Sequence, residues 1–262
     1  MSEELEFAIK LAKDAGKILM QKINNAVIKK YKRDKRDIVT NADLKTEKII
    51  LGMIRRKYPK HKIYSEELGE DKKEEKNIWF IDSLDGTKYY VTGVNLFSVS
   101  IAFWRGDKPI LGVVYMPASD DLYWAETGKG AYHNNKKIKV SSIRQMKEAI
   151  IYLDIAGINK FKKKEASIVL KKFNLIFKNS YRIRSFGWGS AGLCFIAQGA
   201  IDAYFDLSGK VKIYDLAAGI IVAEESGAKI SGLDGNFHGQ RVGHLVVTNG
   251  LLHKKFLKLL NS

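Results

Sequence analysis

Cysteine is almost absent from this sequence: Cys194 is the only one in 262 residues. A single cysteine excludes an intrachain disulfide and any zinc site built from several cysteines. We expect Cys194 to be a small buried apolar side chain. No apolar stretch reaches the roughly 18 residues that span a bilayer, and no hydrophobic signal core follows the acidic N-terminus. These absences predict a soluble cytoplasmic protein without a membrane partner.

Acidic residues are fewer than basic ones: the chain has 29 Asp and Glu and 45 Lys and Arg, which gives a net charge of +16. Such an excess can attract polyanions or phosphorylated substrates. The basic runs nevertheless fall at expected helix ends and polar helix faces, without the interleaved aromatic residues on which nucleic-acid bases stack. We therefore favour a solvated, lysine-rich surface and do not expect a nucleic-acid partner. The Lys- and Ile-rich, Cys-poor composition is also typical of thermophiles.

Hydrophobic periodicity divides the chain into two parts with different patterns. The first part contains amphipathic helices over 6–23 and 43–58 and strands over 62–65, 78–81, 97–104, 109–116, 121–126 and 131–140, the last broken by Asn134-Asn135. The second part alternates strands over 150–153, 181–186, 201–207 and 244–248 with helices over 165–177, 187–199, 215–227 and 251–260. This order predicts an α+β subdomain over residues 1–140 and an α/β subdomain over residues 141–262.

The densest group of chemically useful side chains follows the apolar strand 78–81. Asp82 and Asp85 stand three residues apart, and Gly86 and Thr87 come next. Oxygen ligands at the end of a strand suit a hard cation such as Mg²⁺, and the lack of His and Cys in this segment argues against zinc. Gly86 allows an anion to approach the backbone closely. Asp and Gly also favour ordinary turns, so this segment alone is equally compatible with a turn.

Three further acidic positions lie at boundaries of the expected elements. Glu66 follows the strand 62–65, Asp43 opens one helix and Asp215 opens another. Each has a simpler structural role, because Thr40 or Asn41 can cap the first helix and Asp215 can cap the second. Several carboxylates beside apolar strands, each at an element boundary, favour a shared metal site over separate turns and caps.

In their order along the chain, these motifs resemble the signatures of the inositol monophosphatase family. The residues that carry the resemblance are Asp37-x-Val39-Thr40-x-x-Asp43, Glu66-Glu67, Trp79-x-Ile81-Asp82-x-Leu84-Asp85-Gly86-Thr87 and Asp215-x-Ala217-Ala218-Gly219. The wider superfamily includes fructose-1,6-bisphosphatases and 3′-phosphoadenosine phosphatases. The resemblance extends from the N-terminal helix through residue 250. It implies a layered αβαβα sandwich of the sugar-phosphatase type, commonly assembled as a homodimer.

The resemblance also implies a role for each residue of the site. Two or three Mg²⁺ ions, replaceable by Mn²⁺, would be bound by Glu66, Asp82, Asp85, Asp215 and the carbonyl of Leu84. The catalytic residues around the attacking water would be Thr87, Asp43 and Glu66. The substrate would contact Asp85, Gly86, Thr87, Gly187, Asp206 and Asp215, with the phosphate on the amides of residues 86 and 87. Lys32 stands where the family has a lysine near the site.

Four segments depart from the family pattern without removing a ligand. Ser83 replaces a proline, Tyr89-Tyr90 replace Asn-Phe, Tyr214 replaces Trp, and Gly187-Trp188-Gly189-Ser190 replaces a Gly-Ser/Thr-Ala-Ala segment. The last of these borders the organic half of the substrate in the family, so the departures leave the choice of alcohol open.

The activity implied by the resemblance is Mg²⁺-dependent hydrolysis of a small phosphate monoester by direct attack of water, inhibited by Li⁺. The first substrate expected is myo-inositol 1-phosphate, followed by fructose 1,6-bisphosphate (alone or as a dual activity) and then a nucleotide 3′-phosphate. The non-enzymatic alternative is an RNA-associated regulatory protein on the same scaffold. That role would tolerate loss of ligands, whereas every ligand position is intact.

Overall fold

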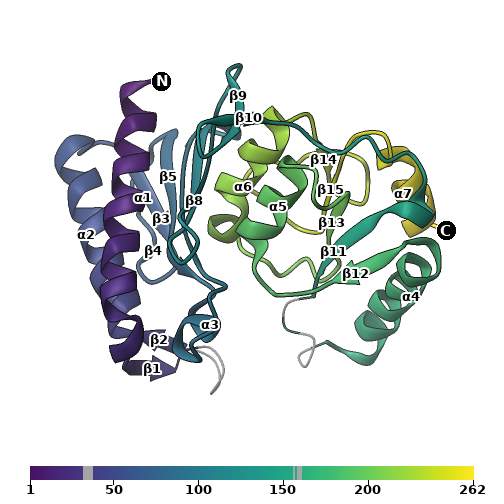
Figure 1. Cartoon of the computed structure of the whole chain (residues 1–262), viewed down its shortest axis with the longest axis horizontal. Coiled ribbons are helices and arrows are strands. Elements are labelled where there is room, and N and C mark those ends of the chain that lie inside the picture. Colours follow the sequence, from purple (N-terminus) through teal and green to yellow (C-terminus); the bar gives the residue numbers. More distant parts are fainter. Residues whose placement is uncertain (32–37, 156, 158–160) are drawn as a thin grey trace.

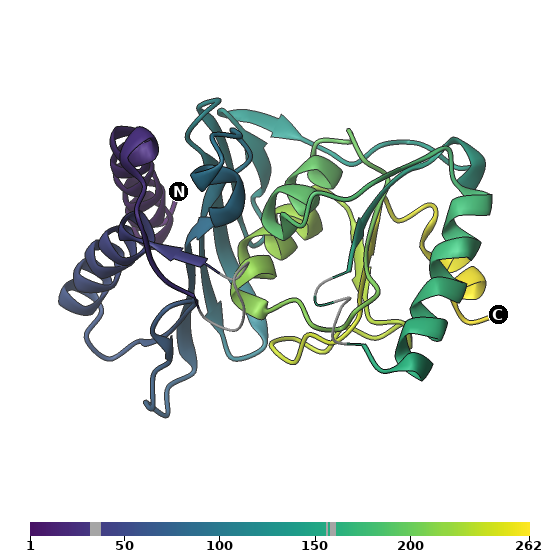
Figure 2. The ribbon, with the colours of Figure 1, turned by 90° about the horizontal axis from the view of Figure 1, so that it is seen from below.

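Five layers of secondary structure stack side by side in the computed structural model, which describes residues 1–31, 38–155, 157 and 161–262 (Figures 1 and 2). The outer helices on one side are α1 (Glu3–Lys22) and α2 (Asn41–Lys57), which cover an eight-stranded sheet. Helices α5 (Gly189–Ala197) and α6 (Ile213–Glu225) form the middle layer. A five-stranded sheet and the outer helices α4 (Lys163–Asn179) and α7 (His253–Leu260) complete the stack. The predicted αβαβα sandwich is confirmed.

The eight-stranded sheet has the order β10-β9-β8-β7-β6-β5-β3-β4, and only β3 and β5 pair in parallel. Its strands are β3 (Lys62–Ser65), β4 (Gly69–Glu70), β5 (Asn77–Asp85), β6 (Ser98–Arg105), β7 (Lys108–Met116), β8 (Asp121–Glu126), β9 (Gly130–His133) and β10 (Lys136–Ile138). The strand expected over 131–140 is a hairpin. Asn134 and Asn135 have φ angles of 43° and 67°, the left-handed pair that a tight two-residue hairpin turn requires.

The five-stranded sheet has the order β12-β11-β13-β15-β14. Its strands are β11 (Ile150–Asp154), β12 (Arg182–Arg184), β13 (Ala203–Asp206), β14 (Lys229–Ser231) and β15 (Leu245–Thr248). The first three strands in this order pair in parallel, and β15 pairs antiparallel with both of its neighbours. Because β11 and β13 run in parallel, their carboxyl ends meet at one edge of the sheet, close to the middle layer of helices.

Several short elements connect these layers. They are the ribbon of the exposed β1 (Ile28–Tyr31) and the largely buried β2 (Ile38–Thr40), the helix α3 (Thr87–Val91) and two 3₁₀ turns (Ile23–Asn25 and Met146–Glu148). The four residues of β1 and the three of β2 are too few to show a hydrophobic alternation in the sequence, and every residue of β1 is exposed. They were therefore not predicted, and neither was β14.

Helix α6 packs directly against the eight-stranded sheet although it comes from the second half of the chain. A Cβ atom on Gly112 of β7 would lie 2.6 Å from the carbonyl oxygen of Ala218, so glycine is required for this approach. The apolar residues of α6 are buried, and one core cluster unites side chains of both sheets with those of α5 and α6. The division at residue 140 stays a prediction, and the chain passes from one sheet to the other between β10 and β11.

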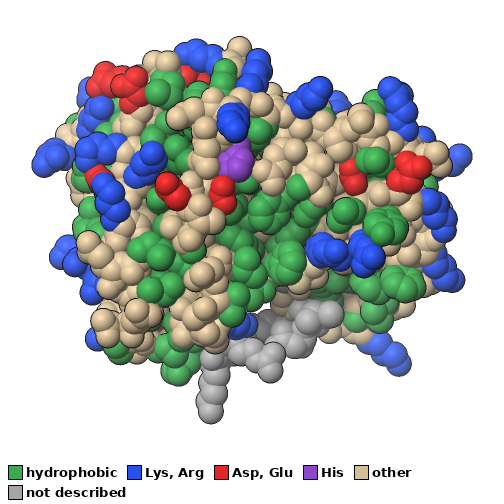
Figure 3. All heavy atoms as spheres, in the orientation of Figure 1, with side chains coloured by type: hydrophobic (Ala, Val, Ile, Leu, Met, Phe, Trp, Pro, Cys, Tyr) green, Lys and Arg blue, Asp and Glu red, His purple; other side chains and the backbone are tan. Residues whose placement is uncertain are grey.

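The structure shows where the single cysteine and the many Lys and Arg side chains lie. Cys194 is fully buried, as expected. On the face shown in Figure 3, Lys and Arg side chains are scattered toward the edges instead of gathering in one patch. No helix in the described residues is long and apolar enough to cross a membrane.

Candidate active site

A cavity of about 390 Å³ opens where β5 ends and α6 begins. Most of the residues selected from the sequence line it: Glu66, Asp82, Leu84, Asp85, Gly86, Thr87, Gly187 and Asp215. The remaining lining residues are Ile38, Lys88, Tyr89 and Phe186. Asp43 reaches this cavity through Thr87, whereas Asp206 does not line it. Lys32 and Asp37 lie outside the described residues.

The end of β5 is shaped to expose its functional groups. The pairing of β5 with β6 changes register between Asp82 and Asp85, which breaks the regular ladder at that point. The amide of Leu84 donates to Asp82 Oδ1 at 3.0 Å and stabilises the turn. Gly86 then has a φ of 92°, and a Cβ atom there would lie 2.4 Å from the carbonyl oxygen of Leu96. Only glycine fits, and the chain continues directly into α3.

The side chain of Asp85 is fixed by a residue from the middle layer of helices. The Ser190 hydroxyl donates to Asp85 Oδ2 at 2.6 Å, and Ser190 also lies 3.0 Å from the hydroxyl of Ser98 on β6. Asp215 is the third residue of α6 and accepts a hydrogen bond at 3.2 Å from the amide of Lys212. The expected capping role of Asp215 is therefore present, and it uses only one oxygen of the carboxylate.

The aspartates that line the cavity are close enough to oppose one another's ionisation. Burial raises the pKa of Asp82 well above its usual value, and the charges of Glu66, Asp85 and Asp215 raise it further. Burial raises the pKa of Asp85 to about 7, with Glu66 adding to the shift. Burial and then Asp85 and Glu66 raise the pKa of Asp215. A cation placed among these groups would relieve their repulsion and favour the ionised forms.

The kind of donor atoms at this site and their unused acceptor capacity both fit Mg²⁺. Each of Asp82, Asp85 and Asp215 uses one carboxylate oxygen as a hydrogen-bond acceptor, and the second oxygen accepts no hydrogen bond from the described residues. All donors are oxygens, as Mg²⁺ prefers. In their present rotamers, no three His, Cys, Asp or Glu side chains of the described chain are grouped to hold a metal ion.

Thr87 is connected to a buried acid on α2. Its hydroxyl lies 3.0 Å from Asp43 Oδ1 and 2.9 Å from the carbonyl oxygen of Leu84. The other oxygen of Asp43 accepts from the amide of Thr40 at 2.9 Å and from the Thr40 hydroxyl. Thr40 is the N-cap of α2, which confirms one of the two predicted caps. Burial raises the pKa of Asp43, and these hydrogen bonds oppose that rise.

A second cavity of about 350 Å³ adjoins the first and shares Glu66, Asp85, Gly187 and Asp215 with it. Its remaining lining is Asp154, Ile155, Gly189, Lys210, Val211, Lys212 and Tyr214. Asp206 is absent from this lining, because its Oδ1 accepts hydrogen bonds from Ser208 and Gly209 beside its own strand. Asp154 lies opposite Asp206 in the parallel register of β11 and β13 and reaches the cavity instead.

Asp154 was not selected from the sequence, although a signal for it existed. Both β11 and β13 end in an aspartate, and parallel neighbouring strands end at the same edge of a sheet. Tyr89, one of the departures from the family pattern, makes another unexpected contact. Its hydroxyl donates to the carbonyl oxygen of Phe186, so α3 is tied to the segment that precedes α5 at the border of the first cavity.

Comparisons with known proteins agree over the full length of the chain. The model of the inositol monophosphatase family matches residues 1–262. A protein of Aquifex aeolicus named fructose-1,6-bisphosphatase/inositol-1-monophosphatase is 32% identical, with 99% of this chain and 96% of that protein covered. The Nus factor SuhB of Vibrio cholerae is 33% identical, with 95% and 92% covered. The solved structure of an IMPase from Thermotoga maritima matches with a TM-score of 0.87 and 28% identity, over 99% of this chain and 97% of that chain.

Proposed function

Since the chain belongs to the inositol monophosphatase family and is a phosphatase, we propose that it hydrolyses a small polyol phosphate monoester, in the first place myo-inositol 1-phosphate. The observation that carries the proposal is one cavity lined by four carboxylates and by Thr87. Four acids around a cavity would repel a phosphate dianion unless cations lay between them. The site therefore suits a phosphate only when it is loaded with metal.

We propose that Glu66, Asp82, Asp85, Asp215 and the Leu84 carbonyl hold two or three Mg²⁺ ions, with Mn²⁺ as a substitute. Metal ions bound there would lower the pKa of a bound water and stabilise charge on the phosphoryl oxygens. The buried positions of Asp82 and Asp85 support this assignment, because ion binding in a poorly solvated site is strengthened by weak screening. The unused oxygen of each aspartate is available for coordination.

The chain's own residues would orient the reacting groups. Thr87, whose hydroxyl donates to Asp43, would accept a hydrogen bond from the attacking water and fix its direction. The amides of Gly86 and Thr87 would contact the phosphate. The water oxygen forms a bond to phosphorus and gives up a proton, while the bond from phosphorus to the alcohol oxygen breaks and the departing alkoxide takes up a proton. The segment 82–87 contains no Cys or His as phosphate acceptor, which favours direct attack over a phosphoenzyme.

The second cavity would receive the organic part of the substrate. We propose that Gly187 and Asp154 shape this side, with Asp206 behind the lining on the strand beside Asp154. Lys210 and Lys212 line the same cavity, so a second phosphate would meet cations there. This favours fructose 1,6-bisphosphate as the second candidate substrate, in keeping with the name of the Aquifex relative. A nucleotide 3′-phosphate is the third candidate.

A substrate panel tests the proposal most directly. Phosphate release would be measured with myo-inositol 1-phosphate, fructose 1,6-bisphosphate and 3′-phosphoadenosine 5′-phosphate, each with Mg²⁺ and with EDTA. We expect Mg²⁺-dependent release that is fastest with the inositol phosphate. Release from none of the three would contradict the proposal. RNA binding that falls with salt and survives EDTA, without phosphatase activity, would support the regulatory alternative suggested by the relatives named Nus factor SuhB.

We further propose four properties on the strength of the family resemblance and the composition. They are inhibition by Li⁺, assembly as a homodimer, a cytoplasmic location and stability typical of a thermophile. Light scattering of the purified protein would measure its mass in solution, and phosphate release at increasing Li⁺ would measure inhibition. We also keep residues 1–140 and 141–262 as two proposed subdomains.

A further inference from the structure

Glu47 is a buried carboxylate on α2, one helical turn after Asp43. Only 4% of its surface is exposed, and no Lys or Arg of the described residues pairs with it. A buried carboxylate without a cation must be stabilised by hydrogen bonds. Its acceptor capacity is used by three donors from one short segment: the hydroxyl of Ser65 (3.0 Å), the amide of Glu67 (3.1 Å) and the amide of Leu68 (2.8 Å).

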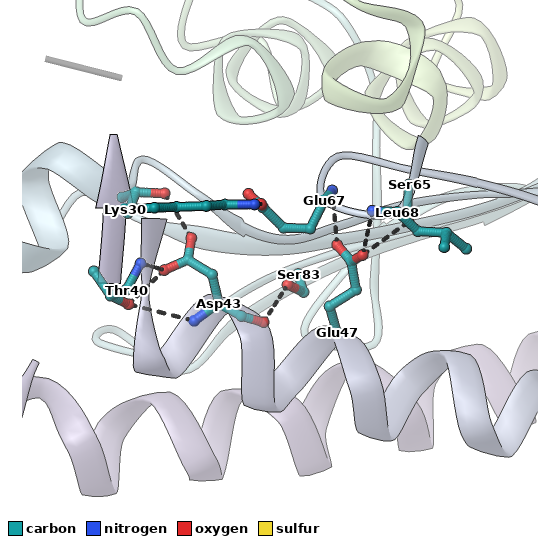
Figure 4. A network of polar contacts seen from close by, with 9 residues as sticks. Lys30, Thr40, Asp43, Glu47, Ser65, Glu67, Leu68 and Ser83 are labelled. Carbon is teal, nitrogen blue, oxygen red and sulfur yellow. Dashed lines mark hydrogen bonds and ion pairs between the residues drawn. The ribbon is translucent and has the colours of Figure 1, made fainter. Parts of the chain in front are cut away.

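These three donors lie on both sides of Glu66 in the chain (Figure 4). The amide of Glu66 itself donates to the carbonyl oxygen of Ile81 on β5 at 3.3 Å. The backbone of Glu66 is thus fixed at its own amide by β5 and at its neighbours by Glu47. Its side chain lines both cavities. Glu47 does not line either of them, so it reaches the site only through this segment.

Asp43 and Glu47 lie on the same face of α2 and hold two different parts of the site (Figure 4). Asp43 binds Thr87 through its side chain, and its carbonyl oxygen accepts from Ser83 at 3.3 Å. Residues four apart on a helix are separated by roughly 6 Å along its axis. One rigid turn of α2 therefore sets the spacing between the end of β5 and the segment that carries Glu66.

We propose that Glu47 is a positioning residue for the metal site: it holds segment 65–68 so that the Glu66 carboxylate points at the ions bound by Asp82 and Asp85. The proposal rests on the proposed function, because it assigns Glu66 to the metal. Groups that orient a ligand typically change metal affinity 10- to 100-fold, as estimated from other metal sites.

Glu47→Gln is the sharpest variant, because it keeps the size of the side chain and removes one acceptor. Whichever way the amide lies, its NH₂ faces the N–H of Glu67 or of Leu68, so one backbone donor loses its acceptor. Mg²⁺ binding to the full chain would be measured by titration calorimetry without substrate, and phosphate release by varying Mg²⁺. We expect affinity to fall on the order of 10-fold or more, with KM for substrate at saturating Mg²⁺ changed much less.

Asp202→Asn is the matched control, since it makes the same chemical change at another buried carboxylate. Asp202 is 4% exposed and accepts hydrogen bonds from the amide of Ile150 at 2.7 Å and from the Ser141 hydroxyl. It lines neither of the two cavities. We expect a loss of thermal stability comparable to that of Glu47→Gln with wild-type Mg²⁺ affinity. An unchanged Mg²⁺ affinity in Glu47→Gln would overturn the proposal. An equal loss of Mg²⁺ affinity in Asp202→Asn would also overturn it.

Two further variants keep the test decisive. If Glu47→Gln does not fold, Ser65→Ala is used instead, because it removes one of the three donors to Glu47. A reduced Mg²⁺ affinity in Ser65→Ala would then support the proposal, and an unchanged affinity would contradict it. Glu66→Gln separates the inference from the function on which it rests. Wild-type Mg²⁺ affinity in Glu66→Gln would refute the metal assignment itself. Weakened Mg²⁺ binding in Glu66→Gln together with wild-type Mg²⁺ affinity in Glu47→Gln would refute only the role of Glu47.

Discussion

Two groups of carboxylates serve the same site, one that lies on α2 behind the first cavity and one that lines that cavity, and the fold satisfies them differently. Asp43 and Glu47 on α2 accept hydrogen bonds on both of their oxygens, all from protein donors. Among the described residues, Asp82, Asp85 and Asp215 each accept on one oxygen only. The first group supports neighbouring segments, while the second keeps acceptor capacity that a cation can use. Burial raises the pKa in both groups, so the number of filled oxygens separates them better than the pKa does.

The largest expected effect comes from an acid of the second group. Asp85→Asn removes one negative ligand, and we expect kcat in Mg²⁺ to fall by at least about 10³-fold, since the charge stabilisation supplied by bound metal amounts to several kcal/mol. Steady-state phosphate release at saturating Mg²⁺ measures this. Activity near that of the wild type would show that Asp85 is not a ligand.

The same variant tests the repulsion among these acids when metal is removed. The pKa of Asp85 lies near 7 in the folded chain, against 3.8 for an ordinary aspartate, so the folded state binds more protons than the unfolded state between these values. The free energy of unfolding in EDTA should therefore fall as the pH rises from about 4 to about 7. Asp85→Asn should show a smaller fall, as measured by denaturant unfolding across this range.

A smaller effect on kcat is expected at Thr87, through which Asp43 of the first group contacts the cavity. Thr87→Ala removes the hydroxyl that joins Asp43 to the cavity, and we expect kcat to fall roughly 10²-fold, the scale of a lost water-orienting group. Folding and Mg²⁺ affinity should be preserved, because the side chain is only partly buried and is not an assigned ligand. Calorimetric Mg²⁺ titration serves as the control. An unchanged kcat would exclude Thr87 from the mechanism.

The smallest effect concerns a buried group that is fully hydrogen-bonded and far from the acids. His253, 4% exposed, lies 2.9 Å from Ser231 and 3.2 Å from Thr248 through its two ring nitrogens. Burial lowers its pKa to about 4. The unfolded chain takes up this proton near pH 6.5, so the free energy of unfolding should fall by about 2 kcal/mol between pH 8 and pH 5.

Denaturant unfolding of the wild type and of His253→Gln at both pH values checks this expectation. The variant should be less stable at pH 8 and should lose less between pH 8 and pH 5. Its Mg²⁺ dependence should match the wild type, because His253 begins α7 and bonds to β14 and β15, where it supports the fold and not the metal site. An equal loss in both proteins would assign the pH effect to other groups.

Local patterns account for what could be predicted from the sequence. The helices and the strands from β5 to β8 have strong hydrophobic periodicity, and the segment 82–87 carries its chemistry within a few residues. The ribbon of β1 and β2 has no such periodicity, because each strand has only three or four residues and β1 is exposed throughout. The αβαβα order came from the family resemblance and not from periodicity alone.

Long-range contacts account for what could not be predicted. Glu47 stands among lysines on a helix, where a polar exposed face is the natural interpretation, and its burial depends on a segment about twenty residues away. Ser190 contacts Asp85 across 105 residues of sequence. Asp154 and Asp206 end neighbouring strands, but only the fold determines that Asp154 reaches the second cavity.

Helix α6 brings Asp215 onto the first sheet from late in the chain, and this has a consequence for synthesis. A ribosome releases Glu66, Asp82 and Asp85 well before α6 exists, so the carboxylate site cannot be completed on a partly made chain. A product that stops short of α6 would also leave the apolar face of the first sheet without its covering helix. Such a fragment would present the kind of surface that chaperones and proteases recognise in incomplete proteins.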